Sequence, residues 1–76
     1  MTEYYIPDSI FNEAINDTDA SVEDVNTFVN TLANKYEAQW EPVSNGYNLQ
    51  FKDKTNAIAL ANDLFDHVEA WRETIS

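Results

Sequence analysis

One short stretch constrains the fold more than any other, because residues 36–51 are predicted to form an antiparallel β-hairpin. It contains Asn45-Gly46, and Gly46 is the only glycine among the 76 residues. Asn-Gly between two runs that alternate apolar and polar residues is the strongest short-range signal for a hairpin turn. We therefore place Asn45 and Gly46 as a two-residue loop.

The pairing that follows from this loop puts the apolar side chains of both strands on one face. The predicted apolar-face partners are Ser44–Tyr47, Pro42–Leu49 and Trp40–Phe51, with Tyr36 and Ala38 continuing that face, and the predicted polar-face partners are Glu41–Gln50, Gln39–Lys52 and Glu37–Lys54. A one-residue slip would mix the two faces, which supports the register. Pro42 conflicts with it, because the position opposite Leu49 needs an N–H group that proline lacks. We expect either a longer loop or a defect in the ladder near the tip.

Two helices are predicted before the hairpin. The spacing of Ile10, Phe11, Ala14 and Ile15 predicts a short helix over about residues 8–16. Ser21, followed by acidic residues, is typical of the N-terminus of a second helix. The apolar face predicted for that second helix consists of Val22, Val25, Phe28, Val29, Leu32, Ala33 and Tyr36, and its opposite, neutral face consists of Asn26, Thr27, Asn30, Thr31 and Asn34.

A third helix is predicted after the hairpin, starting at Asp53 or Thr55, of which Asp53 is favoured because it follows the strand directly. Its predicted apolar face consists of Ala57, Ile58, Ala61, Leu64, Phe65, Val68, Trp71 and Ile75. Residues 2–6 are a candidate for a short third strand. The sequence thus predicts one small α+β domain over residues 1–76, in the order α-α-β-β-α, with an antiparallel hairpin packed against helices.

Composition excludes several classes of function. The chain has 4 Lys and Arg against 14 Asp and Glu, a formal net charge of −10, so it cannot bind nucleic acid directly by neutralising phosphates. The same charge disfavours an anionic membrane surface. There is no cysteine, hence no disulfide and no cysteine-based zinc site. The first residues, Met-Thr-Glu-Tyr-Tyr, do not resemble a signal peptide, and we expect an unprocessed cytoplasmic protein, as a monomer or homodimer.

No residue pattern predicts catalysis, a cofactor or a metal site. His67 is the only histidine, and Asp63 and Asp66 lie near it on the same predicted helix. A carboxylate–histidine metal site needs further ligands, so we interpret His67 as a boundary residue. Asp17 and Asp19 have the spacing that opens a calcium-binding loop, but Val22 stands where that loop requires glycine. We therefore predict a protein that is not an enzyme.

The acidic residues are distributed unevenly along the chain. Residues 1–34 contain no Lys or Arg. Carboxylates arrayed on a rigid surface imitate the field of duplex DNA, which carries about one charge per 1.7 Å of axis. We expect the partner to be a basic nucleic-acid-binding protein. The predicted partner-binding residues are Asp17, Asp19, Glu23, Asp24, Asp63, Asp66, Glu69 and Glu73.

In composition the chain resembles small acidic inhibitors of phages and mobile elements, among them DNA mimics, anti-restriction proteins and anti-CRISPR proteins. The resemblance is one of size, charge and aromatic content, and it implies an inhibitor or modulator that occupies the nucleic-acid-binding surface of its target. The alternative prediction is a protein–protein interaction or structural module that recognises its partner through the hairpin edge or the neutral face of the second helix.

Overall fold

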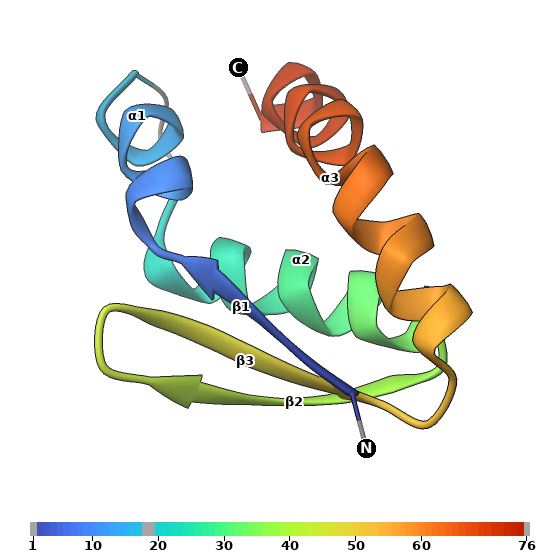
Figure 1. Ribbon diagram of the computed structural model, residues 1–76. Coiled ribbons are helices and arrows are strands. Elements are labelled where there is room, and N and C mark those ends of the chain that lie inside the picture. Colours follow the sequence, from blue (N-terminus) through green and yellow to red (C-terminus); the bar gives the residue numbers. More distant parts are fainter. Residues whose placement is uncertain (1, 18–19, 76) are drawn as a thin grey trace.

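All three helices cover one face of a three-stranded antiparallel sheet, so the domain is α+β as predicted (Figure 1). The computed structural model describes residues 2–17 and 20–75. The elements are β1 (Thr2–Pro7), α1 (Ser9–Asp17), α2 (Val22–Lys35), β2 (Ala38–Val43), β3 (Gly46–Phe51) and α3 (Lys54–Ile75). The predicted order is confirmed, and the candidate N-terminal strand exists as β1.

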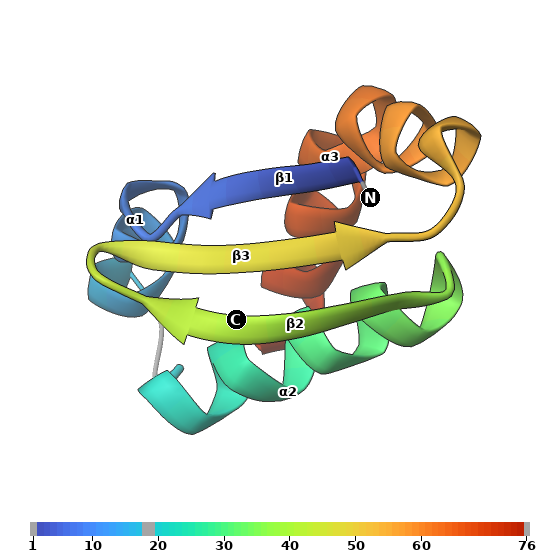
Figure 2. The same ribbon diagram turned by 60° about the horizontal axis from the view of Figure 1, so that its bottom comes forward.

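The sheet has the order β1-β3-β2, which makes β3 the central strand. Figure 2 views the sheet from the side that carries no helix, with the three strands in front of the helices. The apolar side chains of β3 (Tyr47, Leu49 and Phe51) are buried. They meet Ile6 of β1 and, from the helices, Phe11, Val29 and Leu60, all of which are almost fully buried. The core therefore lies entirely between the sheet and the helices.

The hairpin forms where predicted, but its register differs from the predicted one. Val43 pairs with Gly46, Pro42 with Tyr47 and Trp40 with Leu49. The predicted pairs of Pro42 with Leu49 and of Trp40 with Phe51 are therefore wrong. The two-residue loop is Ser44-Asn45 instead of Asn45-Gly46. The predicted apolar face is nevertheless retained, because the partners shift by two residues and side chains alternate with a period of two.

Backbone hydrogen bonding explains why the register shifts. The N–H of Asp8 donates to the carbonyl of Asn45 at 2.9 Å, so Asn45 directs its polar groups towards β1. Successive residues of a strand alternate sides, hence Gly46 is directed towards Val43 of β2 and Tyr47 towards β1. Pro42, opposite Tyr47, then stands at a non-hydrogen-bonded position, where the ladder needs no N–H. Neither the longer loop nor the ladder defect that we expected is needed.

Gly46 is required for a reason other than turn geometry. The left-handed backbone conformation belongs to Asn45, with φ of 64°, and Gly46 has no positive φ. A Cβ atom at Gly46 would instead overlap the carbonyl oxygen of Ile6 and lie 2.7 Å from Cε1 of Tyr5. The Tyr5 ring covers this glycine, and its hydroxyl donates to the Asn45 carbonyl at 2.7 Å. Glycine thus allows β1 to approach the hairpin closely.

The segment between α2 and β2 corrects a second prediction. Tyr36 is the C-cap of α2, and its N–H donates to the Leu32 carbonyl at 3.1 Å. Glu37 has φ of 56°, a left-handed conformation that turns the chain into β2. Tyr36 and Glu37 were predicted within the hairpin, and both lie outside its strands. The polar-face pairs predicted for Gln39 and Glu41 are also replaced, by Gln39–Gln50 and Glu41–Asn48.

The start of α2 is fixed by its first side chains. The N–H of Ser21 donates to Oδ2 of Asp24 at 2.8 Å, and the N–H of Asp24 donates to Oγ of Ser21 at 3.3 Å. This is a complete capping box with Asp in the place of the usual Glu or Gln. Val25, Val29, Leu32 and Ala33 of the predicted apolar face are buried. Val22 is 64% exposed, so its assignment to that face is wrong.

The helix α3 begins as predicted but buries a rotated face. The Asp53 carboxylate accepts a hydrogen bond from the N–H of Thr55 at 2.8 Å, as an N-cap residue does. Leu60, absent from the predicted face, is fully buried. Ile58 and Phe65 are 51% and 67% exposed, and Ala61 is exposed as well. The predicted face was too wide, because the sheet covers only the side of α3 that carries Ala57, Leu60, Leu64 and Val68.

The close approach at Gly46 yields a stability prediction. Replacement of Gly46 by Ala should lower the free energy of unfolding by about 1–3 kcal/mol, since the methyl group meets a backbone carbonyl that cannot rotate away. A melting temperature lower by several degrees in circular dichroism would confirm it. Asn45→Gly is the matched control and should keep or slightly raise stability, because φ there is positive. Equal melting of Gly46→Ala and the wild type would contradict the prediction.

Candidate functional site: the acidic surface and the groove between α2 and α3

Exposed carboxylates far outnumber exposed cations on the described surface. Every carboxylate whose side chain the structure describes is exposed, namely Glu3, Asp8, Glu23, Asp24, Glu37, Glu41, Asp53, Asp63, Asp66, Glu69 and Glu73. The lysines Lys35, Lys52 and Lys54 are also exposed, at the end of α2, the end of β3 and the start of α3. These three positions lie at one end of the molecule, on the right in Figure 1. The fourth basic residue, the half-buried Arg72, lines a shallow hollow on α3 together with Glu69 and Glu73. The rest of the described surface carries carboxylates without a Lys or Arg side chain.

The helix α3 carries the longest row of predicted partner-binding residues. Asp63, Asp66, Glu69 and Glu73 are all exposed along its outer side, and we call them the α3 acidic row. From Asp63 to Glu73 the helix rises about 15 Å, so neighbouring charges of the row are spaced by about 5 Å along the axis. A single DNA strand carries one charge per about 3.4 Å. The row therefore approaches the charge spacing of one nucleic-acid strand.

The other predicted acidic residues are only partly described. Glu23 and Asp24 lie in the first turn of α2. Asp24 and Thr74 line the same groove, which brings the first turn of α2 close to the last turns of α3 and hence to the α3 acidic row. Asp19 and the side chain of Asp17 lie outside the described residues. The structure thus places Asp24 of α2 beside residues of α3 that are distant in the sequence.

The groove between α2 and α3 was not predicted from the sequence. Its floor is formed by Phe28 and Trp71, whose rings stack with centroids 5.0 Å apart and an interplanar angle of 20°. Phe11 meets both rings edge-on from the core side, at 5.8 and 5.9 Å. The groove has a volume of about 380 Å³, and Asp24, Thr31 and Thr74 are among its polar lining residues. Both residues were predicted on the apolar faces of their helices. In the structure both are half-buried and pack against the margin of the core.

His67 lies at the end of this groove nearest Tyr36. Its Nε2 atom is 2.7 Å from the Tyr36 hydroxyl, and the two rings meet edge-on. The structure places it half-buried, which agrees with its interpretation as a boundary residue. Within residues 2–17 and 20–75, no group of three or more His, Asp or Glu side chains is arranged to hold a metal ion.

Two tyrosines, Tyr36 at the end of α2 and Tyr47 in β3, have a raised pKa. Burial raises the pKa of Tyr36 above its usual value of 10.0, and the negative charge of Asp63 raises it further. Burial likewise raises the pKa of Tyr47, and Asp8 adds to that rise. In both cases the environment favours the neutral phenol. Both phenols are therefore neutral near pH 7.

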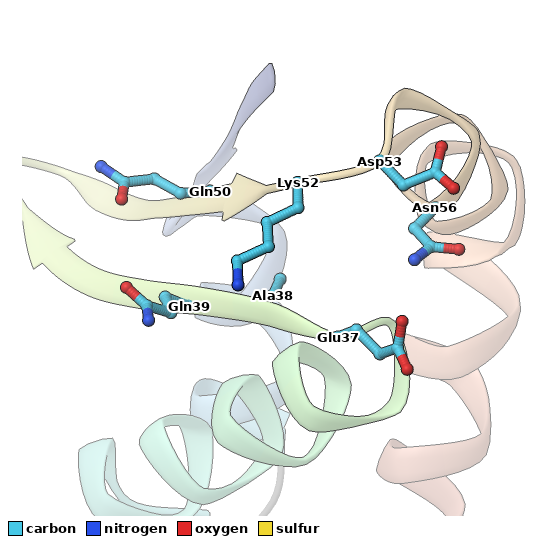
Figure 3. Close-up of a pocket in the computed structure, with 7 residues that line it drawn as sticks. All are labelled: Glu37, Ala38, Gln39, Gln50, Lys52, Asp53 and Asn56. Carbon is cyan, nitrogen blue, oxygen red and sulfur yellow. The ribbon is translucent and has the colours of Figure 1, made fainter. Parts of the chain in front are cut away.

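A second depression lies at the lysine-rich end of the open sheet face. It has a volume of about 390 Å³. Figure 3 shows Gln39 and Gln50 at one end of it, and Glu37, Asp53 and Asn56 at the other end near the start of α3, with Lys52 between them. These polar groups point in different directions and do not converge on one point. The depression therefore lacks the arrangement that binding of a small molecule requires.

The neutral face of α2 is partly occupied by contacts with the sheet. The Tyr47 hydroxyl donates to Oδ1 of Asn26 at 3.1 Å, and Nε1 of Trp40 donates to Oδ1 of Asn30 at 3.0 Å. Thr27 and Thr31 face the groove instead. The predicted neutral face of α2 is thus divided: its asparagines contact the sheet and its threonines line the groove.

No protein-family model, curated protein or solved structure matches this chain. None of the helices in the described part of the chain combines the length and the apolar character that crossing a membrane demands. Function must therefore be inferred from the surface itself.

The raised pKa values predict a loss of stability at alkaline pH. The two tyrosines stabilise the fold fully below their unfolded-state pKa, near 10, and this contribution is lost as the pH rises through the higher folded-state pKa. The double variant Tyr36→Phe, Tyr47→Phe should therefore lose less unfolding free energy than the wild type between about pH 9 and pH 12. Urea denaturation across that range measures the two slopes. Identical slopes would contradict the assignment, whatever the absolute stabilities at neutral pH.

Proposed function

We propose that this protein is a non-enzymatic inhibitor or modulator that binds the basic, nucleic-acid-binding surface of a partner protein. The observation that carries the proposal is the α3 acidic row, in which Asp63, Asp66, Glu69 and Glu73 are exposed on one rigid helix. Because the helix is already ordered, binding through this row does not have to offset the entropy cost of ordering a flexible segment. This supports competition with a nucleic-acid strand for the same cationic groove.

Long-range attraction supports the same proposal. A formal charge of −10 on 76 residues attracts cationic partners and repels acidic ones. At physiological ionic strength the screening length is about 8 Å, so the field acts mainly on groups near the surface. Nucleic acid itself is repelled. A protein that must expose a strongly positive surface is the partner that gains most from this field.

The biological setting proposed for this activity is defence and counter-defence. Restriction and CRISPR enzymes expose extended basic surfaces to nucleic acid, and a small acidic protein that occupies such a surface blocks them. We therefore propose an anti-restriction or anti-CRISPR type of inhibitor from a phage or mobile element, acting in the cytoplasm. The negative charge of each copy opposes self-association unless the partner neutralises it.

Affinity purification from the native cell, followed by mass spectrometry, tests the class of partner. We expect a basic nucleic-acid-binding protein whose binding is competed by duplex DNA. The affinity should fall steeply between about 50 and 300 mM salt, because the contacts are ionic. Binding that is indifferent both to salt and to competing DNA would overturn the proposal.

A matched pair of charge variants then locates the surface. The triple variant Asp66→Asn, Glu69→Gln, Glu73→Gln removes three charges from the α3 acidic row, and Glu3→Gln, Glu37→Gln, Glu41→Gln removes three exposed charges from the sheet side. We expect the first variant to weaken binding by about 3- to 150-fold and to flatten its salt dependence, since each of the three lost exposed pairs contributes about 0.2–1 kcal/mol. The second should have a clearly smaller effect. Equal weakening would show that net charge, not the α3 acidic row, determines binding.

The alternative proposal is an interaction module that uses the hairpin edge or the neutral face of α2. The observation in its favour is that β2 forms an edge of the sheet in the strand order β1-β3-β2. Pro42 contributes no donor to that edge, which limits its pairing with another strand. Under this alternative Asn30→Arg, or a further proline in β2, would abolish binding while neutralisation of the α3 acidic row would not.

A further inference from the structure

We infer that the groove between α2 and α3 receives an arginine side chain of the basic partner protein. The inference rests on the proposed function and adds the chemical group that is recognised at short range. Three properties of the groove carry it: its aromatic floor, the hydrogen-bonding polarity of its walls and the charge around it.

The floor suits a flat cationic group. Phe28 and Trp71 are half-buried and stack with one another, and Phe11 holds both rings from the core side. The stack covers one face of each ring, and a cation placed over the other face of Trp71 is attracted by that face. A guanidinium group is planar and weakly hydrated, so it can lie against such a surface at little desolvation cost.

The walls offer hydrogen-bond acceptors. The Thr31 hydroxyl donates to the Thr27 carbonyl at 2.9 Å, and the Thr74 hydroxyl donates to the Trp71 carbonyl at 2.6 Å. Each hydroxyl has thereby used its hydrogen, and its remaining lone pairs can only accept. The Asp24 carboxylate also lines the groove and is held in place by the capping box through Oδ2. A ligand for these walls must therefore bring donors, and arginine brings five and no acceptor.

The charge around the groove excludes anions and favours cations. Asp24 lies on the α2 side, and Asp63, Asp66 and Glu73 lie on α3 close to the lining residues His67, Ala70 and Thr74. A lysine ammonium would also be attracted, but it is compact and strongly hydrated and cannot stack as a plane. The combination of stacking floor and accepting walls thus distinguishes arginine from lysine. This discrimination is what the proposal adds to a general attraction between opposite charges.

Two synthetic peptides of equal length and charge test the discrimination, nona-arginine and nona-lysine. In ¹H–¹⁵N NMR titrations of the whole protein we expect tighter binding of nona-arginine, with the largest shifts at the Trp71 indole N–H and at the amides of Thr31 and Thr74. The indole N–H of Trp40 donates to Asn30 outside the groove and serves as an internal reference. Equal affinities with shifts spread along α3 would overturn the groove assignment and leave the proposed function standing. Failure of both peptides to bind at low salt would count against the proposed function itself.

Two matched pairs of variants locate the contact. Ala70 is exposed and lines the groove, whereas Ala61 is exposed on the other flank of α3, so Ala70→Leu fills the groove and Ala61→Leu does not. Asp24→Asn removes a charge at the groove, and Glu41→Gln removes one on the open sheet face. We expect Ala70→Leu and Asp24→Asn each to weaken nona-arginine binding by about tenfold, and the controls to change it little. Unchanged preference for arginine in Ala70→Leu would overturn the inference, because that substitution leaves every charge and the aromatic core in place.

Discussion

Burial of one face of β3 is the constraint on which the rest of this structure depends. With β3 between β1 and β2, its side chains Tyr47, Leu49 and Phe51 are covered by helices on a single side. A chain of this size gains little core elsewhere, and no charged or polar side chain among the described residues is buried in this one. The carboxylates must therefore lie on the outer sides of the helices and on the open sheet face. The acidic surface is a consequence of the same layering that forms the core.

The hairpin shows which part of a fold the sequence determines and which part depends on the third strand. Alternation with a period of two identifies the apolar face correctly, and that face survives a two-residue change of partners. The loop position depends on hydrogen bonds between Asp8 and Asn45 and on the close approach of β1 to Gly46. Both are long-range contacts that the local pattern does not contain. The Asn-Gly pair indicated the turn, but its two residues have different roles. Asn45 takes the left-handed conformation, whereas Gly46 avoids a clash with Ile6 and Tyr5 of β1.

Helical periodicity similarly predicted where the helices lie, but it did not predict correctly which of their side chains are buried. On α3 the predicted apolar face included Ile58 and Phe65 and left out Leu60, whereas the position of the sheet shows that Leu60 is buried and the other two are exposed. The acidic row could be predicted, because charged residues on a helix are almost always exposed. The groove could not, because Phe28 and Trp71 come together only when α2 and α3 pack side by side. Residues that meet only through the packing of two separate helices have no characteristic separation in the sequence, so no motif predicts such a site.

Under the proposed function, the α3 acidic row and the groove would act over different distances, and this difference decides what each could contribute to binding. The row attracts any cationic surface and is screened within about 8 Å at physiological salt, so its main effect is on the rate and orientation of encounter. It distinguishes poorly between one basic protein and another. The groove acts only on contact, through a fixed aromatic floor and acceptors whose hydrogens are already committed. Under the proposed function, specificity among basic partners would therefore come from groups of this second kind, since a long-range field does not distinguish the shapes of cationic side chains.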